Sequence, residues 1–203
     1  MQANFAEFLL AAIVMEITPG PNMTWLALLS AREGRTAGLM AVAGIASGLA
    51  LLALVAAMGA AALITAWPPL YEILRWGGVL FLFYLAYEAW RGEKDTGSAD
   101  LAGKHFWRGL VVNLLNPKAA AVYIVMIPSF AGPAPANTGA LITMTLAYLA
   151  IATAAHVLIV LFAATFQKAL ADPRRERIVR RIFAVLLAAI AIWFAFTSGR
   201  ALP

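Results

Sequence analysis

Two apolar stretches of the chain are each interrupted by proline, and this feature constrains the fold most strongly. One interruption falls at Thr18–Asn22 and the other at Asn113–Lys118. A backbone break inside a lipid bilayer leaves peptide groups unpaired, so it must pack on protein or line a wet cavity. Matched Gly- or Pro-interrupted segments in the two halves of a membrane chain are typical of the solute sites of transporters.

The composition is that of a chain buried in lipid. Hydrophobic residues make up 63% of the 203 positions and charged residues 12%, about half the charged fraction of an ordinary soluble domain. Thr36–Tyr71 and Ala119–Gln167 contain no charged residue, and each run exceeds the roughly 20 residues of one spanning helix. We expect an all-α integral membrane protein, because a soluble helical bundle needs a polar face toward water.

The N-terminus and the missing cysteines exclude several other classes. Met1–Met15 contains no Lys or Arg, whereas a signal peptide begins with a basic region, so we expect this segment to be retained as a spanning helix. The absence of cysteine excludes disulfides and thiol chemistry. The sequence has no phosphate-binding loop for ATP. We expect no cofactor, no bound metal, no nucleic-acid partner and no enzymatic activity.

Apolar runs and the polar segments between them predict about six spanning helices within one transmembrane domain, residues 1–203. The polar stretch 92–104 divides this domain into two three-helix halves, residues 4–91 and 105–200. Because each half has an odd number of helices, the second half enters the membrane from the opposite side and any internal repeat is inverted. The predicted spans are Phe5–Ala31, Ala37–Ala66, Leu70–Trp90, Phe106–Ala131, Gly139–Phe166 and Ile178–Thr197.

The basic residues predict how these helices are oriented. Lys and Arg gather in the loops after the first, third and fifth spans, and the loops after the second and fourth carry none. Cytoplasmic loops of membrane proteins carry this excess of basic residues. We therefore expect a multi-pass protein of the cytoplasmic membrane with both termini outside.

The two breaks are predicted to lie near the middle of the membrane. About 15 Å of helix separates Asn22 from Arg32, and about as much separates Pro117 from Arg108, in a hydrocarbon core of ~30 Å. Each proline frees the carbonyl four residues before it, so Pro117 should free that of Asn113. The residues expected to bind substrate are Thr18, Pro19, Gly20, Pro21, Asn22, Asn113, Asn116, Pro117 and Lys118.

Lys118 is the most informative single residue of this set. A lysine at the bilayer centre costs ~3 kcal/mol and usually pairs inside the protein, and Glu16 is at a similar depth. One hypothesis is a Glu16–Lys118 ion pair that a zwitterionic substrate divides, its carboxylate going to Lys118 and its ammonium to Glu16. The other is an ion pair that only fixes the register of the helices.

His156 lies in the middle of the fifth predicted span. Its charge changes near neutral pH, which suits a proton relay. A histidine that is merely hydrogen-bonded to a neighbouring helix fits the same position.

Two glycines spaced by four, Gly44 and Gly48, predict a close helix–helix contact in the second span. This contact forms either within the chain or between the subunits of a homo-oligomer.

The two proline motifs, with Gly44, Gly48 and the Gly109–Leu110 lead into the fourth span, resemble the LysE/RhtB family of bacterial amino-acid exporters. The resemblance extends from Phe5 to about Phe194. It implies efflux of amino acids across the inner membrane, driven by proton antiport. It also implies that the two proline motifs form the translocation site.

A metal-ion or other small-cation exporter of the same superfamily is the alternative. Such a protein needs clustered Asp, Glu, His or Cys ligands near the membrane midplane, where this chain offers Glu16 and His156. A scaffold without transport activity would have no reason to keep Lys118 at that depth.

Overall fold

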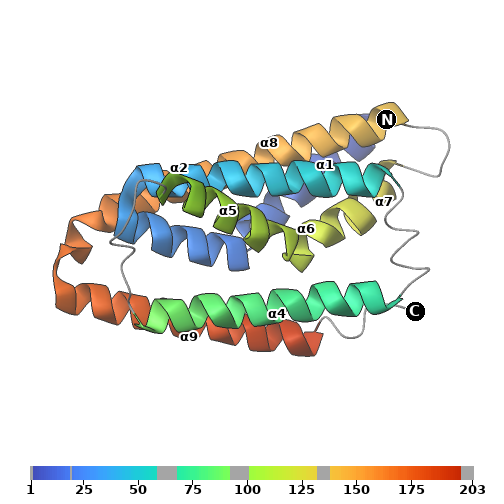
Figure 1. Cartoon of the computed structure of the whole chain (residues 1–203). Coiled ribbons are helices and arrows are strands. Elements are labelled where there is room, and N and C mark those ends of the chain that lie inside the picture. The colour runs from blue at the N-terminus through green and yellow to red at the C-terminus, as the bar shows by residue number, and fades with distance from the viewer. Residues whose placement is uncertain (1, 19, 59–67, 92–100, 132–137, 198–203) are drawn as a thin grey trace.

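The computed structural model describes residues 2–18, 20–58, 68–91, 101–131 and 138–197, and every element in these ranges is a helix. Figure 1 shows the helices lying roughly along one common direction. They are α1 (Gln2–Ile17), α2 (Pro21–Ala57), α4 (Pro68–Arg91), α5 (Leu101–Leu114), α6 (Pro117–Ala121), the π-helix η1 (Val122–Met126), α7 (Ile127–Ala131), α8 (Thr138–Ala163), the 3₁₀-helices η2 (Ala164–Gln167) and η3 (Ala169–Ala171), and α9 (Pro173–Thr197).

Helix α2 is two antiparallel segments joined at Gly34. Gly34 has φ 88° and ψ −174°, a conformation essentially confined to glycine. A Cβ on Gly38 would lie 2.4 Å from Ser30 Oγ, although eight residues of straight helix span about 12 Å. The chain therefore reverses at Gly34, as Figure 1 also shows, and the predicted loop between the first two spans is confirmed as this single turn.

Both predicted breaks are present in the backbone. Helix α1 ends at Ile17, and α2 begins after Gly20, which is extended with φ −142° and ψ 175°. Helix α5 ends at Leu114, and α6 begins after Asn116, with a 55° bend between the two flanking segments. Pro21 and Pro117 each open a helix, a position where the missing N–H breaks no helical hydrogen bond. Pro19 lies outside the described residues.

Helices α2 and α5 approach each other closely enough for their backbones to touch. A Cβ on Gly44 would lie 2.0 Å from the carbonyl oxygen of Phe106, and one on Gly109 would lie 2.2 Å from that of Ala41. Only glycine fits at such distances. The contact predicted for Gly44 and Gly48 is therefore confirmed, and it lies within one chain.

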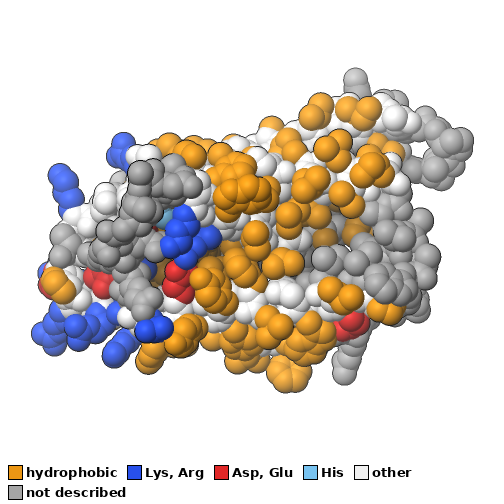
Figure 2. All heavy atoms as spheres, in the orientation of Figure 1, with side chains coloured by type: hydrophobic (Ala, Val, Ile, Leu, Met, Phe, Trp, Pro, Cys, Tyr) orange, Lys and Arg blue, Asp and Glu red, His pale blue; other side chains and the backbone are white. Residues whose placement is uncertain are grey.

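Charged residues tie several elements together at one end of the molecule. Arg32 Nε lies 3.0 Å from Glu176 Oε1, and His105 Nε2 lies 3.2 Å from Glu33 Oε2. Arg180 donates to the carbonyl of Ala89 at 2.6 Å. These contacts join the Gly34 turn, the end of α4 and the starts of α5 and α9. Figure 2 shows Lys and Arg gathered at this end and hydrophobic side chains over the middle of the same face.

Large apolar side chains cover the outside of the helices. Leu10, Leu54, Leu80, Phe162 and Phe196 are all more than half exposed, as expected for a surface that meets lipid. Among the described helices, two are long and apolar enough to cross a membrane, Asn22–Ala57 and Thr138–Gln167. The bent pair Gly103–Leu114 and Lys118–Ala131 makes a third if it counts as one span.

Two predicted boundaries are wrong. Helix α5 begins at Leu101, inside the predicted linker 92–104, and residues 92–100 of that linker lie outside the described residues. Helix α5 starts earlier because of a tertiary contact, in which the buried His105 pairs with Glu33. Helix α9 begins at Pro173 rather than Ile178, because Asp172 Oδ1 accepts from the backbone N–H of Arg174 at 2.8 Å and starts the helix there.

Candidate functional site

The two helix breaks meet at a small internal cavity of about 10 Å³, room for about one water molecule. Residues from both breaks and from α8 form its walls, although they lie far apart in the sequence. The lining residues are Glu16, Gly20, Asn22, Met23, Leu49, Asn113, Asn116, Lys118, Ala119, Tyr148 and His156.

Two hydrogen bonds connect the first break to the second. Lys118 Nζ donates to the carbonyl oxygen of Thr18 at 3.0 Å, and Asn22 Nδ2 donates to Asn113 Oδ1 at 2.9 Å. The first bond places a cation on the last turn of α1, where the helix dipole favours positive charge. Each break therefore supplies a partner for polar groups of the other.

Glu16 is buried against groups from two other helices. Its Oε1 lies 3.9 Å from Lys118 Nζ and accepts a hydrogen bond of 2.8 Å from Tyr148 Oη. The predicted Glu16–Lys118 ion pair is thus formed. A buried carboxylate is tolerated in an apolar interior when it has this kind of pairing.

The two helix starts at the cavity differ in how they are capped. Asn116 Oδ1 accepts from the backbone N–H of Lys118 at 3.0 Å and so caps α6. The N-cap of α2 is Gly20, which has no side chain, so the first N–H groups of α2 are left for another acceptor. The expectation that the carbonyl of Asn113 is free is wrong, because the N–H of Asn116 donates to it at 3.0 Å.

Four buried polar atoms near the cavity have no hydrogen-bond partner within the described part of the chain. They are Asn22 Oδ1, Asn113 Nδ2, Tyr123 Oη and His156 Nδ1. Buried polar groups in proteins are almost always paired. Asn22 and Asn113 line the cavity wall and offer one acceptor and one donor to whatever enters it.

Most of the predicted site residues come together at this cavity. Thr18 contributes its carbonyl. Pro21 and Pro117 open their helices, and their side chains, like the whole of Pro19, lie outside the description. The predicted residues that line the cavity are Glu16, Gly20, Asn22, Asn113, Asn116, Lys118 and His156.

Two tyrosines at the site were not predicted. Tyr148, Ala152 and His156 are all buried and spaced by four on α8, so the helical spacing from His156 could have indicated Tyr148. Tyr123 packs edge-on against Tyr148, with ring centroids 5.6 Å apart. Tyr123 lies in η1, and a π-turn shifts the helical register, so the regular spacing of an α-helix could not have placed it.

No group of three or more His, Cys, Asp or Glu side chains lies together among the residues that the structure describes.

Comparison with known proteins identifies the family. The LysE type translocator family matches residues 13–198. An uncharacterized membrane protein of Pseudomonas aeruginosa is 32% identical over 146 residues, covering 67% of this chain and 68% of the relative. A leucine efflux protein of Salmonella typhimurium is 31% identical over 142 residues, covering 67% of each, and a leucine efflux protein of Enterobacter sp. matches to the same extent. No solved structure matches. The chain, with its two proline-broken helices meeting at one cavity, belongs to the LysE type translocator family.

Proposed function

We propose that this protein exports amino acids across the bacterial cytoplasmic membrane by secondary active transport. The observation that carries the proposal is the joining of the two breaks at a buried cavity that holds one cation, Lys118, and one anion, Glu16. A free amino acid is a zwitterion with the same two charges. The site is thus complementary to the one feature that all amino acids share.

In the proposed bound state the substrate divides the ion pair. Its carboxylate takes the ammonium of Lys118 and the uncapped N–H groups at the start of α2, where the helix dipole favours an anion. Its ammonium takes the carboxylate of Glu16. Asn22 and Asn113 hold the substrate further with the acceptor and donor that they leave unpaired.

The rest of the cavity wall favours a neutral, apolar substrate side chain. Met23, Leu49 and Ala119 supply the apolar part of the lining. Glu16 and Lys118 are engaged by the substrate's own charged groups, which leaves neither of them for a charged side chain. Because the cavity holds about one water molecule, the two broken helices must move apart to admit a substrate. The apolar wall then matches an aliphatic amino acid best, and the leucine efflux proteins among the relatives support the choice.

Proton antiport is proposed to act at Glu16. A proton that binds this carboxylate from outside neutralises it, so the ammonium of the amino acid loses its partner and the substrate leaves. The carboxylate then loses the proton to the cytoplasm and takes the next substrate. Tyr148 holds the carboxylate in place, and His156 on the same wall is a second proton carrier.

For the topology, we propose six spans in two inverted repeats, residues 4–91 and 105–200. Helices α4 and α9, each the last of its half, lie together as a separate layer in Figure 1, which supports the pairing of equivalent elements. The basic end is the cytoplasmic one by the positive-inside rule. The start of α1 lies at the opposite end, as an external N-terminus requires.

Counterflow in proteoliposomes tests the function. Vesicles loaded with unlabelled leucine should accumulate external labelled leucine, and other aliphatic amino acids should compete. A pH gradient should drive net movement against the concentration gradient. Uptake of a divalent metal without uptake of any amino acid would reverse the assignment in favour of a cation exporter.

A further inference from the structure

A second cavity, of about 540 Å³, lies at the basic end of the molecule. The segment of α2 before Gly34, the end of α8 with η2, and η3 with the start of α9 form its walls. Its lining includes Ala27, Ala31, Phe166, Ile178 and Phe183, and Arg175 is the one charged residue among the described residues that line it. The volume is within the roughly 300–1,000 Å³ range of small-molecule sites.

The cavity opens toward the outside of the helix bundle. Phe162, Phe166 and Ile178 on its rim are 69%, 48% and 52% exposed. In a membrane these side chains meet acyl chains rather than water. The hollow is thus a groove in the lipid-facing surface, separate from the substrate cavity between the two breaks.

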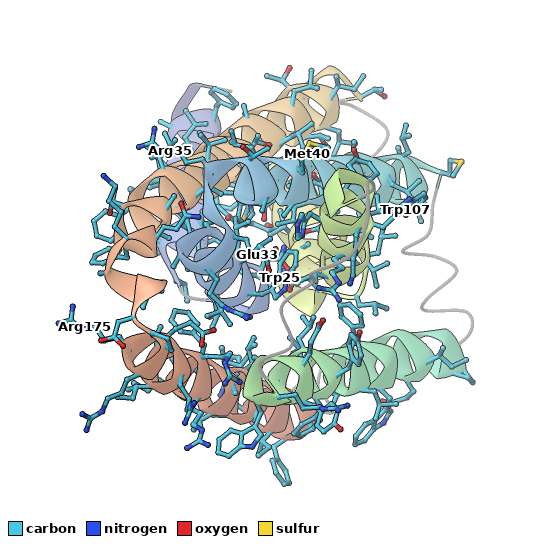
Figure 3. The ribbon with its side chains drawn as sticks, turned by 60° about the vertical axis from the view of Figure 1, so that its left-hand side comes forward. Trp25, Glu33, Arg35, Met40, Trp107 and Arg175 are labelled. Atoms are coloured by element: carbon cyan, nitrogen blue, oxygen red, sulfur yellow. The ribbon has the colours of Figure 1, made fainter. Side chains whose placement is uncertain are left out.

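Positive charge surrounds the end of this groove. Arg175, with 69% of its side chain exposed, lies at the start of α9, at the edge of the molecule in Figure 3. Exposed basic residues on the same elements are Lys168, Arg174, Arg177 and Arg181. Asp172, at 3.7 Å from Arg175 Nε, is half exposed, and an ion pair this exposed is worth little, so an anion can compete for the arginine.

We propose that this groove binds an anionic phospholipid. One acyl chain lies along the apolar wall, and the guanidinium of Arg175 binds the phosphate of the headgroup. Basic pockets between membrane helices on the cytoplasmic side are typical of such lipid binding. The arrangement needs an apolar tail and an anionic head on one molecule, a combination that separates it from a free amino acid and from a neutral lipid.

Native mass spectrometry of the detergent-purified protein, titrated with phosphatidylglycerol or phosphatidylcholine, tests the proposal. Wild type should retain one phosphatidylglycerol in preference to phosphatidylcholine. Arg175→Gln should lower that preference about fivefold, the effect of one basic residue near an anionic headgroup. Arg174→Gln is the matched control, because Arg174 is a neighbouring exposed arginine that does not line the groove.

A second variant tests the apolar wall separately. Ala27→Leu should reduce the retention of both lipids by filling the groove, and a thermal unfolding curve shows whether that variant is folded. Equal retention of the two lipids by wild type would overturn the proposal. An Arg174→Gln effect as large as that of Arg175→Gln would also overturn it, since the attraction would then be diffuse. Neither result touches the amino-acid counterflow that tests the transport function.

Discussion

Lys118 Nζ donates to the carbonyl of Thr18 at 3.0 Å, so a side chain from the second broken helix caps the last turn of the first. The same ammonium lies 3.9 Å from Glu16. One lysine therefore serves two structural partners and is also the proposed partner of the substrate carboxylate. Its substitution should affect transport and stability in ways that can be separated.

Replacing Lys118 with Met should abolish amino-acid counterflow, because the substrate carboxylate loses its cation. It should also destabilise the protein, since leaving one buried member of an ion pair unpaired costs about 3–5 kcal/mol. Counterflow and thermal unfolding in detergent measure the two effects. Lys168→Met is the control, because Lys168 is exposed at the basic end.

The double variant Lys118→Met with Glu16→Gln separates structure from transport. Removing both charges should recover much of the lost stability while counterflow stays absent. Recovered counterflow in the double variant would reduce the pair to a structural role.

Glu16→Gln alone should uncouple transport from protons. The amide keeps an acceptor for Tyr148 Oη but cannot exchange a proton in this way. Residual counterflow should be slow, because the amide resembles the protonated acid that releases the substrate, and a pH gradient should no longer drive net export. Tyr148→Phe is the control, because it removes only the hydrogen bond and should keep the response to the gradient. Gradient-driven export by Glu16→Gln at the wild-type rate would remove Glu16 from the coupling.

Loss of the hydrogen bond between Asn22 and Asn113 should weaken substrate binding. Each single change to Ala removes a neutral hydrogen bond worth about 1 kcal/mol and leaves the other amide unsatisfied. Substrate affinity should therefore fall about five- to tenfold in each variant. The double variant should lose less than the sum of the two. Strictly additive effects on the KM of counterflow would show that the two amides act independently.

Gly44→Ala should destabilise the protein by more than the ~1–3 kcal/mol typical of overpacking. The added methyl would meet the backbone carbonyl of Phe106, which cannot rotate away as a side chain can. Gly139→Ala is the matched control, because its Cβ meets nothing within 4 Å. The two unfolding midpoints in the same detergent give the comparison, and equal values would contradict the close contact of α2 and α5.

The parts of the fold that depend on local chemistry were predictable from the sequence. Proline lacks the N–H that a helix interior needs, so the breaks before Pro21 and Pro117 could be predicted from the local sequence. Basic residues marked the loop between the first two spans, and a lysine in an apolar stretch required an acid such as Glu16. The sequence did not single out Gly34 as the point of reversal.

The parts of the fold and of the site that depend on packing between helices could not be predicted from the sequence. Tyr148 and Tyr123 are ordinary aromatic residues in long apolar helices, and only the approach of these helices to Glu16 gives them a role. Lys118 binds the carbonyl of Thr18. The missing N–H of Pro117 had indicated a different free carbonyl, that of Asn113. The starts of α5 and α9 depended on His105 meeting Glu33 and on the side chain of Asp172.

The size of the central cavity has a consequence for energy conservation in the cell. The cavity has space for about one water molecule, and Asn22 is hydrogen-bonded to Asn113 and Lys118 to Thr18, so the proposed binding groups close on one another. A transporter closed in this way gives hydrogen ions no continuous aqueous route. It should therefore be able to sit in an energised membrane without dissipating the electrochemical gradient.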